Sequence, residues 1–328
     1  MNQPAHWRTV YAIGECMVEF SRCRDDEYRR SFAGDVYNTA VYLKRLLAGP
    51  CNVEFVSAVG DDAMSAAMMK AWRDEKLSTS HVAVIKGKSP GLYVIDTDEA
   101  GERCFSYWRS QSAARDLTVA LKRMEGHAFR QGDYIYYSGI TVAILDQERR
   151  EILFDFIERA RSQGVIVAFD PNFRPALWES RAVAAATTGK AYGLADIVLT
   201  GADEEASLFG RKSQTSVLGE LDRIGVREAL LKAGKRGIFG TDNGRRFHIP
   251  FLAAEKVVDT TAAGDSFAGA YLAFRLAQKP PQDAAALAMR VARMVVASRG
   301  AIIERQSFAS RLREDRLVGA RDPSDNGD

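Results

Sequence analysis

Residues 259–267 read Asp-Thr-Thr-Ala-Ala-Gly-Asp-Ser-Phe, and an apolar run with helical spacing follows them. Three small residues, Ala262, Ala263 and Gly264, therefore precede the carboxylate of Asp265 at a predicted helix start. Backbone N–H groups at a helix N-terminus have no partner within the helix, and small residues let a phosphate approach them closely. Asp265 could take a proton from a substrate hydroxyl there. An aspartate that only caps a helix would give part of this pattern, but the complete string favours phosphoryl transfer.

Short apolar strand patterns alternate with helical patterns along most of the chain. The predicted buried strands are residues 10–14, 53–59, 134–138, 165–169, 197–199 and 229–232. Apolar residues recur at helical spacing over 40–47 and over 145–161. Strands separated by helix-length segments imply β-α-β units. We therefore expect an α/β fold with a mostly parallel central sheet and helices on both faces.

Two segments depart from this rhythm. Residues 17–33 and 92–108 alternate between polar and apolar side chains, the second around a predicted turn at 98–101, and both are typical of hairpins. Residues 313–328 are charged, contain Pro, Ser, Asn and Gly, and show no apolar periodicity. We expect that last stretch to be a disordered tail after one domain that spans residues 1–312.

Composition disfavours several classes of protein. The chain has 328 residues, is 46% apolar, and carries 45 basic against 43 acidic residues. This balance lacks the positive excess of nucleic-acid-binding or membrane-surface proteins. Residues 1–8 contain no apolar signal-peptide core, and no run of about 18 apolar residues occurs. The four cysteines and four histidines have no metal-ligand or redox spacing. We expect a cytoplasmic protein with small-molecule partners.

The string at 259–267 resembles the C-terminal signature of the ribokinase-like (phosphofructokinase B) sugar kinases, which usually has Gly at the position of Ala262. Alanine at this position is found in the branch that phosphorylates keto sugar acids. Segments 14–20, 32–40, 107–115 and 170–174 also resemble motifs of that branch, the third being the most specific. The resemblance runs from about Val10 to about Glu304. It implies a ribokinase-like fold with a small β-lid from about residues 15–33 and 91–110.

The resemblance also implies a substrate site. Asp265 would be the catalytic base, and the backbone of Ala262, Ala263 and Gly264 would hold the migrating phosphate. The implied substrate-binding residues, together with Asp265, are Gly34, Asp35, Asn38, Tyr93, Tyr107, Arg109 and Arg174. A sugar acid needs fixed cations for its carboxylate, and Arg offers a planar bidentate fork. Surface arginines, and a turn with a helix cap at 34–35, remain the alternative interpretation of these residues.

Further positions would serve the nucleotide and metal ions. By resemblance, Lys232, Gly234, Gly237 and Gly264 lie along the phosphates of ATP. Glu204 would order Mg²⁺ through water, although the Asn that usually stands three residues earlier is Gly201 here. Asp259 and Thr261 resemble positions that bind a monovalent cation such as K⁺ in some relatives. Taken without the resemblance, 203–205 could be a helix-dipole cap and 234–240 a tight turn between two strands.

The resemblance implies an ATP-dependent kinase that phosphorylates 2-keto-3-deoxygluconate at its terminal hydroxyl. Kinases of 2-ketogluconate, fructose or ribose remain alternatives. A catalytically silent sugar-acid-binding regulator is a further alternative, which the intact Gly264 and Asp265 disfavour. A dinucleotide-dependent dehydrogenase is also disfavoured, because the glycines at 234–240 do not form Gly-x-Gly-x-x-Gly. In the resembled family the lid often forms a homo-oligomer interface, and we expect the same here.

Overall fold

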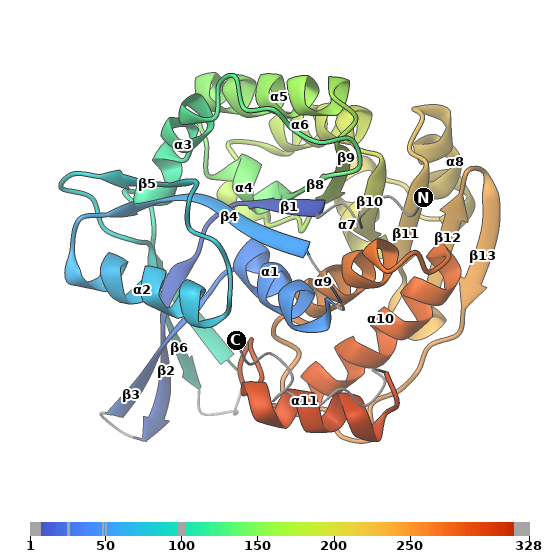
Figure 1. The fold of residues 1–328 in the computed structure, drawn as a ribbon. Helices are drawn as coiled ribbons and strands as arrows, with labels where there is room; N and C mark the ends of the chain where they lie inside the picture. Colours follow the sequence, from blue (N-terminus) through green and yellow to red (C-terminus); the bar gives the residue numbers. More distant parts are fainter. Residues whose placement is uncertain (1–7, 25–26, 48, 50, 98–102, 318–328) are drawn as a thin grey trace, which may run out of the picture.

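The computed structural model describes residues 8–24, 27–47, 49, 51–97 and 103–317. Within these residues a nine-stranded sheet has the order β13-β12-β11-β10-β9-β8-β1-β4-β5 (Figure 1). The pairs from β11 to β5 are parallel, and β12 and β13 extend the β11 edge in antiparallel fashion. The strands are β1 Arg8–Ile13, β4 Cys51–Gly60, β5 Val82–Ile85, β8 Tyr134–Ser138, β9 Ile166–Asp170, β10 Ile197–Gly201, β11 Glu228–Lys232, β12 Ile238–Asp242 and β13 Arg245–Ile249.

Helices cover both faces of this sheet (Figure 1). One face carries α1 Asp35–Leu46, α2 Ala63–Asp74, α9 Ala263–Leu276, α10 Pro281–Val296 and α11 Arg305–Glu314. The other carries α3 Thr118–Arg123, α4 Gly139–Ala143, α5 Gln147–Ser162, α6 Arg181–Leu194 and α8 Gln214–Arg223, while α7 Ala202–Phe209 directly follows β10. Each face has its own apolar core, so the sheet is buried between two layers of helices.

The side chains of β1 show how the sequence builds these two cores. Val10 and Ala12 belong to the core under α1, α9 and α10, whereas Tyr11 and Ile13 belong to the core under α3 and α5. Successive side chains of a strand point to opposite faces, so a continuously apolar strand fits only between two buried layers. The apolar runs in the sequence therefore specify central strands.

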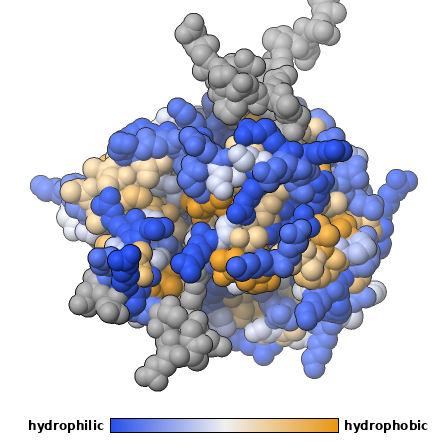
Figure 2. Space-filling model, turned by 90° about the horizontal axis from the view of Figure 1, so that it is seen from below, coloured by the Kyte–Doolittle hydropathy of each residue, from blue (hydrophilic) through white to orange (hydrophobic). Residues whose placement is uncertain are grey.

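A separate four-stranded sheet, which we call the lid, has the order β3-β2-β6-β7 in the described residues. Its strands are β2 Met17–Arg24, β3 Glu27–Ala33, β6 Leu92–Thr97 and β7 Arg103–Trp108. Strands β2 and β6 pair in parallel, and each forms an antiparallel pair with its hairpin partner. Seen from the side where the lid and α11 lie, the surface is mostly hydrophilic, with apolar groups interrupted by polar ones (Figure 2).

The predicted strands, the two helical segments and both lid hairpins are confirmed. Neither edge strand of the large sheet was predicted: β13, Arg-Arg-Phe-His-Ile, lacks a buried apolar run, and β5, Val-Ala-Val-Ile, is only four residues long. The predicted turn at 98–101 lies outside the described residues. Of the expected tail, α11 continues through Glu314, and 318–328 lie outside the described residues. None of the described helices is both long and apolar enough to span a membrane.

Candidate active site

Three adjacent parallel strands of the large sheet end at one cavity. The last residues of β9, β10 and β11 are Asp170, Gly201 and Lys232, and the first turn of α9 lies beside them. The cavity has a volume of about 260 Å³. It is lined by Asp170, Asn172, Arg174, Gly201, Ala202, Asp203, Glu204, Lys232, Gly264 and Asp265. Because ligands of open α/β sheets bind outside the carboxyl ends of the strands, this cavity is the candidate active site.

The loop that leads into α9 is fixed by a buried carboxylate. Asp259 is 4% exposed, and its two oxygens accept the N–H groups of Thr261 at 2.9 Å and Gly300 at 2.7 Å. Ala262 then adopts the left-handed conformation, with φ 59° and ψ 15°. That conformation costs a residue with a Cβ about 1–2 kcal/mol. This explains why the resembled signature usually has Gly at the position of Ala262.

The first turn of α9 lies beside the end of β11. The N–H of Ala263 donates to the carbonyl of Thr260 at 3.2 Å, so it is already used within the loop. The N–H groups of Gly264 and Asp265 follow in the first turn, where a helix has no internal acceptor for them. A Cβ added to Gly264 would meet only the Nζ of Lys232, at 3.9 Å. The space beside Gly264 therefore belongs to the cavity.

The carboxylate of Asp265 is held from helix α1. Asn38 donates from Nδ2 to Oδ2 of Asp265 at 2.8 Å, and Thr39 donates from Oγ1 to the Asp265 carbonyl at 3.1 Å. Burial, followed by the nearby Asp35 carboxylate, raises the pKa of Asp265 to about 7, although the bond from Asn38 acts in the opposite direction. A carboxyl group with such a pKa can accept a proton near neutral pH.

A half-buried ion pair crosses the ends of β9 and β11. The Nζ of Lys232 lies 2.9 Å from Oδ2 of Asp170, and Oδ1 of Asp170 accepts the N–H of Asn172 at 3.0 Å. Burial alone would lower the pKa of Lys232, but the carboxylates of Asp170 and Glu204 outweigh it, and the pKa is raised. Lys232 therefore stays cationic at the cavity, where it can face phosphate oxygens.

Glu204 lies in the first turn of α7 and is held by two backbone groups. Its Oε2 accepts the N–H of Gly201 at 2.8 Å, and its Oε1 accepts the N–H of Phe173 at 3.1 Å. Burial raises the pKa of Glu204, and the Lys232 cation opposes this shift. Across the described ranges, no group of three or more His, Cys, Asp or Glu side chains is arranged to hold a metal ion.

The predicted sugar-binding turn joins the lid to α1. Gly34 has extended backbone (φ 172°), and a Cβ there would lie 2.5 Å from the carbonyl oxygen of Glu15. Close backbone packing therefore requires glycine at this position. Asp35 opens α1, and its Oδ2 accepts Nδ2 of Asn172 at 3.0 Å. This bond joins two of the segments that carry the family resemblance.

Arg109 has a buried partner that the sequence did not reveal. It pairs with Oε2 of Glu15, a carboxylate only 2% exposed, while Oε1 of Glu15 accepts Oγ of Ser112 at 2.7 Å. The Nε of Arg109 is buried and has no partner in the described part of the chain. This N–H is therefore an unsatisfied buried donor, which carries an energetic cost.

The remaining predicted substrate residues differ in exposure. Tyr107 is 53% exposed, whereas Tyr93 is 7% exposed and stacks against it, with ring centroids 5.6 Å apart. Arg174 is exposed at the cavity, and the bond from its Nη1 to the carbonyl of Phe173 measures 3.3 Å. The structure therefore brings Arg174, Asp265 and Lys232 to the cavity itself, with Tyr93 and Tyr107 on the lid.

The predicted glycines of the nucleotide loop lie in a turn between β11 and β12. Gly234 and Gly237 have φ angles of 55° and 84°, and a short 3₁₀ helix joins them. A Cβ on Gly237 would lie 2.1 Å from the carbonyl oxygen of Ile249. The turn therefore needs glycine at 237 for its own packing. Neither glycine lines the cavity, although Lys232, two residues before Gly234, does.

The family model that matches this chain is that of the pfkB family carbohydrate kinases, and it covers residues 8–307. The chain belongs to this family. It is 36% identical to the 2-dehydro-3-deoxygluconokinase of Escherichia coli (strain K12) over 92% of this chain and 99% of that protein. It is 38% identical to the 2-dehydro-3-deoxygluconokinase of Dickeya dadantii (strain 3937), over 90% and 97% of the two chains.

A solved member of the pfkB family has the same architecture. The crystal structure of a fructokinase from Vibrio cholerae O395 with fructose, ADP and calcium ion superposes with a TM-score of 0.78, at 25% identity. The match covers 92% of this chain and 98% of that one. The ribokinase-like fold class and the assignment to an ATP-dependent sugar kinase, both expected from the sequence, are therefore confirmed.

Two buried carboxylates that hold predicted site residues in place were not assigned from the sequence. Asp170 and Glu15 lie within segments 170–174 and 14–20, which resemble family motifs, but neither residue was given a role. The position of Asp170 at the end of a predicted parallel strand was a usable signal, since such ends form the ligand site of α/β sheets. Nothing local to Glu15 indicates that Arg109, which is 94 residues away, would pair with it.

Proposed function

We propose that this protein phosphorylates the terminal hydroxyl of 2-keto-3-deoxygluconate (2-dehydro-3-deoxygluconate) with ATP. The observation that carries the proposal is the position of Asp265, whose pKa is raised to about 7 in the first turn of α9 at the end of the cavity. The relatives at 36% and 38% identity, which carry the name 2-dehydro-3-deoxygluconokinase, support this choice of acceptor.

The chemistry follows from that position. Asp265 accepts the proton of the acceptor hydroxyl while that oxygen attacks the γ-phosphorus, and the bond from this phosphorus to the oxygen shared with the β-phosphate breaks, so that ADP leaves. The N–H groups of Gly264 and Asp265 face the phosphoryl oxygens at the helix N-terminus, while Ala262 and Ala263 shape the turn that leaves room for the phosphate. Lys232 meets the same charge from the end of β11. Since Asp170 holds Lys232 at 2.9 Å, this cation is in place before the substrate arrives.

The acceptor lies between this centre and the lid. Arg109 and Arg174 pair with its carboxylate, with Tyr107 beside them, because guanidinium groups bind carboxylates bidentately. Gly34, Asp35 and Asn38 contact the sugar chain from the start of α1. Closure of the lid over the bound acceptor would exclude water and so limit the hydrolysis of ATP.

ATP would bring Mg²⁺ to the site. Mg²⁺ keeps several waters and is bound by few carboxylates together with phosphate oxygens. The small number of acidic side chains at this cavity is consistent with such coordination. Glu204 and Asp170 are the side chains that would hold its waters, and the bound ion would supply positive charge to the β- and γ-phosphates. Gly234 and Gly237 would flank the nucleotide. Asp259 and Thr261 are our candidates for a monovalent cation site, to be checked by comparing rates in K⁺ and Na⁺.

A coupled ADP-release assay with about ten sugars and sugar acids tests the proposal. We expect 2-keto-3-deoxygluconate to give the highest kcat/KM, above 2-ketogluconate, fructose and ribose. Asp265→Asn should lower kcat by roughly 10²–10⁴, as expected for loss of a general base. No ADP release with any acceptor would support a silent regulator, and near-normal turnover of Asp265→Asn would remove this residue from the chemistry.

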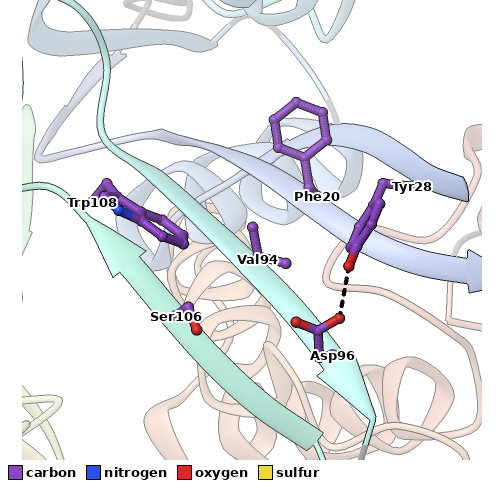
Figure 3. A pocket seen from close by; sticks show the side chains of 6 residues that line it. All are labelled: Phe20, Tyr28, Val94, Asp96, Ser106 and Trp108. Atoms are coloured by element: carbon purple, nitrogen blue, oxygen red, sulfur yellow. Dashed lines mark hydrogen bonds between the residues drawn. The ribbon is translucent and has the colours of Figure 1, made fainter. Parts of the chain in front are cut away.

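We also propose a homo-oligomer formed through the outer face of the lid. Phe20, Tyr28, Val94, Asp96, Ser106 and Trp108 line a hollow of about 410 Å³ there (Figure 3). Trp108, at one end of the hollow, is 60% exposed. The Nε of Arg22 lies 2.7 Å from Oδ1 of Asp96 and forms an ion pair with it. Protein–protein interfaces commonly have aromatic residues at their centre and polar or charged residues around them, and this face of the lid has the same arrangement. A second copy of the lid can meet this face across a two-fold axis.

Sedimentation of the native protein at micromolar concentration should give at least a dimer, and Trp108→Glu should give a monomer. Phe251→Glu is the matched control, because Phe251 is 49% exposed and lies outside the lid. A native monomer, or an unchanged mass for Trp108→Glu, would contradict the interface.

A further inference from the structure

One face of the lid turns towards the start of α9. Met17, Ala33 and Tyr93 are buried in one cluster, and Ala262 packs against it. Glu19 and Tyr93 occupy directly opposed positions on the paired strands β2 and β6, so both side chains lie on this face. Any polar atom that Glu19 or Tyr93 offers to a ligand on this face therefore lies next to the proposed phosphoryl-transfer centre.

Glu19 on this face is a buried carboxylate surrounded by hydroxyl groups. It is 5% exposed. Its Oε1 accepts Oγ of Ser31 at 2.8 Å and Oγ of Ser21 at 3.1 Å, while its Oε2 accepts the hydroxyl of Tyr93. No Lys or Arg of the described residues forms an ion pair with it. The three hydroxyl donors compensate for the burial of this charge.

This network determines what Tyr93 can offer a ligand. Burial, and then the Glu19 carboxylate, raise the pKa of Tyr93 far above its usual value, so the phenol keeps its proton. A tyrosine hydroxyl has a single hydrogen, and here that hydrogen is directed to Glu19. Only lone pairs of the phenol oxygen remain. Tyr93 can therefore accept a hydrogen bond from a ligand but cannot donate one.

We propose that Glu19 is a positioning residue that fixes Tyr93 as a hydrogen-bond acceptor for a secondary hydroxyl of the sugar chain. The inference rests on the proposed function, since it assumes a polyhydroxy acid in this site. The phenol lone pair and the Glu19 charge repel a carboxylate at this point, whereas Arg109 and Arg174 attract one. The acid group is thereby directed towards the arginines, and the hydroxyl-bearing carbons towards Tyr93.

Fluorinated analogues test the direction of this bond in the native enzyme. Fluorine can accept a hydrogen bond but cannot donate one, so a deoxyfluoro analogue separates the two roles of Tyr93. At either C4 or C5 of 2-keto-3-deoxygluconate, the deoxy and the deoxyfluoro analogue should both show a KM about 3- to 12-fold above the parent substrate. Tyr93→Phe should raise KM for the parent by the same factor and should abolish the difference between parent and analogues.

A double-mutant cycle tests the role of Glu19. Glu19→Met removes the acceptor, so KM should rise about 3- to 12-fold with kcat within threefold, and this effect should vanish in the Tyr93→Phe background. Ser31→Ala is the control, because it removes a different bond to Glu19 and should lower Tm without changing KM. Additive effects of Glu19→Met and Tyr93→Phe would overturn the positioning role.

The test with deoxy and deoxyfluoro analogues uses the native enzyme, so it remains valid if Glu19→Met does not fold. A deoxyfluoro analogue that binds like the parent while the deoxy analogue binds weakly would show that Tyr93 donates, and would overturn the inference. Analogues at both carbons that bind like the parent would also overturn it. Either result, obtained with an enzyme that phosphorylates 2-keto-3-deoxygluconate, leaves the proposed function intact. Failure of that phosphorylation would contradict the proposed function itself.

Discussion

Asn38 donates a hydrogen bond of 2.8 Å to the carboxylate of Asp265, across 227 positions of the chain. It joins α1, the helix after the lid, to α9, the helix that begins at the cavity. The bond stabilises the ionised form of Asp265, while burial and the carboxylates of Asp35 and Asp170 disfavour it. The balance leaves Asp265 able to change protonation near neutral pH, which gives two consequences for pH dependence.

The first prediction concerns the native protein. Because the base must be ionised, kcat/KM should rise about tenfold per pH unit below pH 7 and level off above it. The free energy of unfolding should instead decrease as the pH rises. The pKa of Asp265 is raised from 3.8 to about 7, so the bound proton stabilises the fold fully below pH 4 and progressively less towards pH 7. Asp265→Asn should flatten this part of the stability profile, which chemical denaturation at each pH would measure.

The second prediction concerns Asn38. Asn38→Ala removes the bond that favours the carboxylate, so the pKa of Asp265 should rise and the ascending limb of kcat/KM should move to higher pH. Thr39→Val is the control, because Thr39 bonds the carbonyl of Asp265 rather than its carboxylate. The control should lower stability and leave the limb in place. Equal shifts in both variants would mean that the helix contact, not the hydrogen bond, sets the pKa.

Much of the fold was predictable because its signals are local. The apolar run of β1 must be buried on both faces, and Gly264 with Asp265 lies at the start of a helix as expected. Both edge strands were missed, β13 because partial exposure gives its residues no apolar pattern, and β5 because an apolar run of four residues is too short to indicate a strand. Register within the lid was also beyond the sequence, because it depends on pairing between β2 and β6, about 74 residues apart.

The candidate site was predictable only where its chemistry is encoded in a contiguous motif. Asp265 and Lys232 were found in this way, and both line the cavity. The partners that set their behaviour, Asn38 and Asp170, come from distant segments. The hydrogen bond of Ala263 could not be predicted either. Its N–H donates to the carbonyl of Thr260, within a loop whose path does not follow from residue spacing. Motifs indicate candidate reacting groups, whereas tertiary contacts set their protonation and orientation.

The third prediction separates a functional glycine from a structural one on the same helix. Gly264→Val has only the Nζ of Lys232 near its Cβ, at 3.9 Å, so the fold should tolerate it while the phosphate loses its space. We expect kcat to fall about 10²-fold, as when an oxyanion contact is lost. A Cβ on Gly269 would lie 2.4 Å from the carbonyl oxygen of Thr39, so Gly269→Ala should lower stability by about 1–3 kcal/mol. Thermal unfolding and steady-state kinetics of both variants measure these effects. Unchanged kinetics of a folded Gly264→Val protein would mean that the phosphate binds elsewhere.

The last prediction concerns the carboxylate clamp, and the structure makes Arg174 its sharper test. Arg109→Ala would leave buried Glu15 without its cation, so its effect would mix stability with binding. Arg174 is exposed and bonds only the carbonyl of Phe173 in the described residues, so Arg174→Ala should fold normally. A charge-assisted bond is worth about 1.5–3 kcal/mol, so KM for the keto acid should rise about 10- to 150-fold with little change in KM for ATP. Arg181→Ala is the matched control, because Arg181 is also exposed and donates to a carbonyl, that of Leu208, at 3.3 Å.

A substrate analogue tests the same clamp from the side of the ligand. An analogue with a primary alcohol in place of the carboxylate should bind the native enzyme weakly, and Arg174→Ala should weaken its binding little further. If that variant still prefers the acid over the alcohol as strongly as the native enzyme does, Arg174 does not bind the carboxylate.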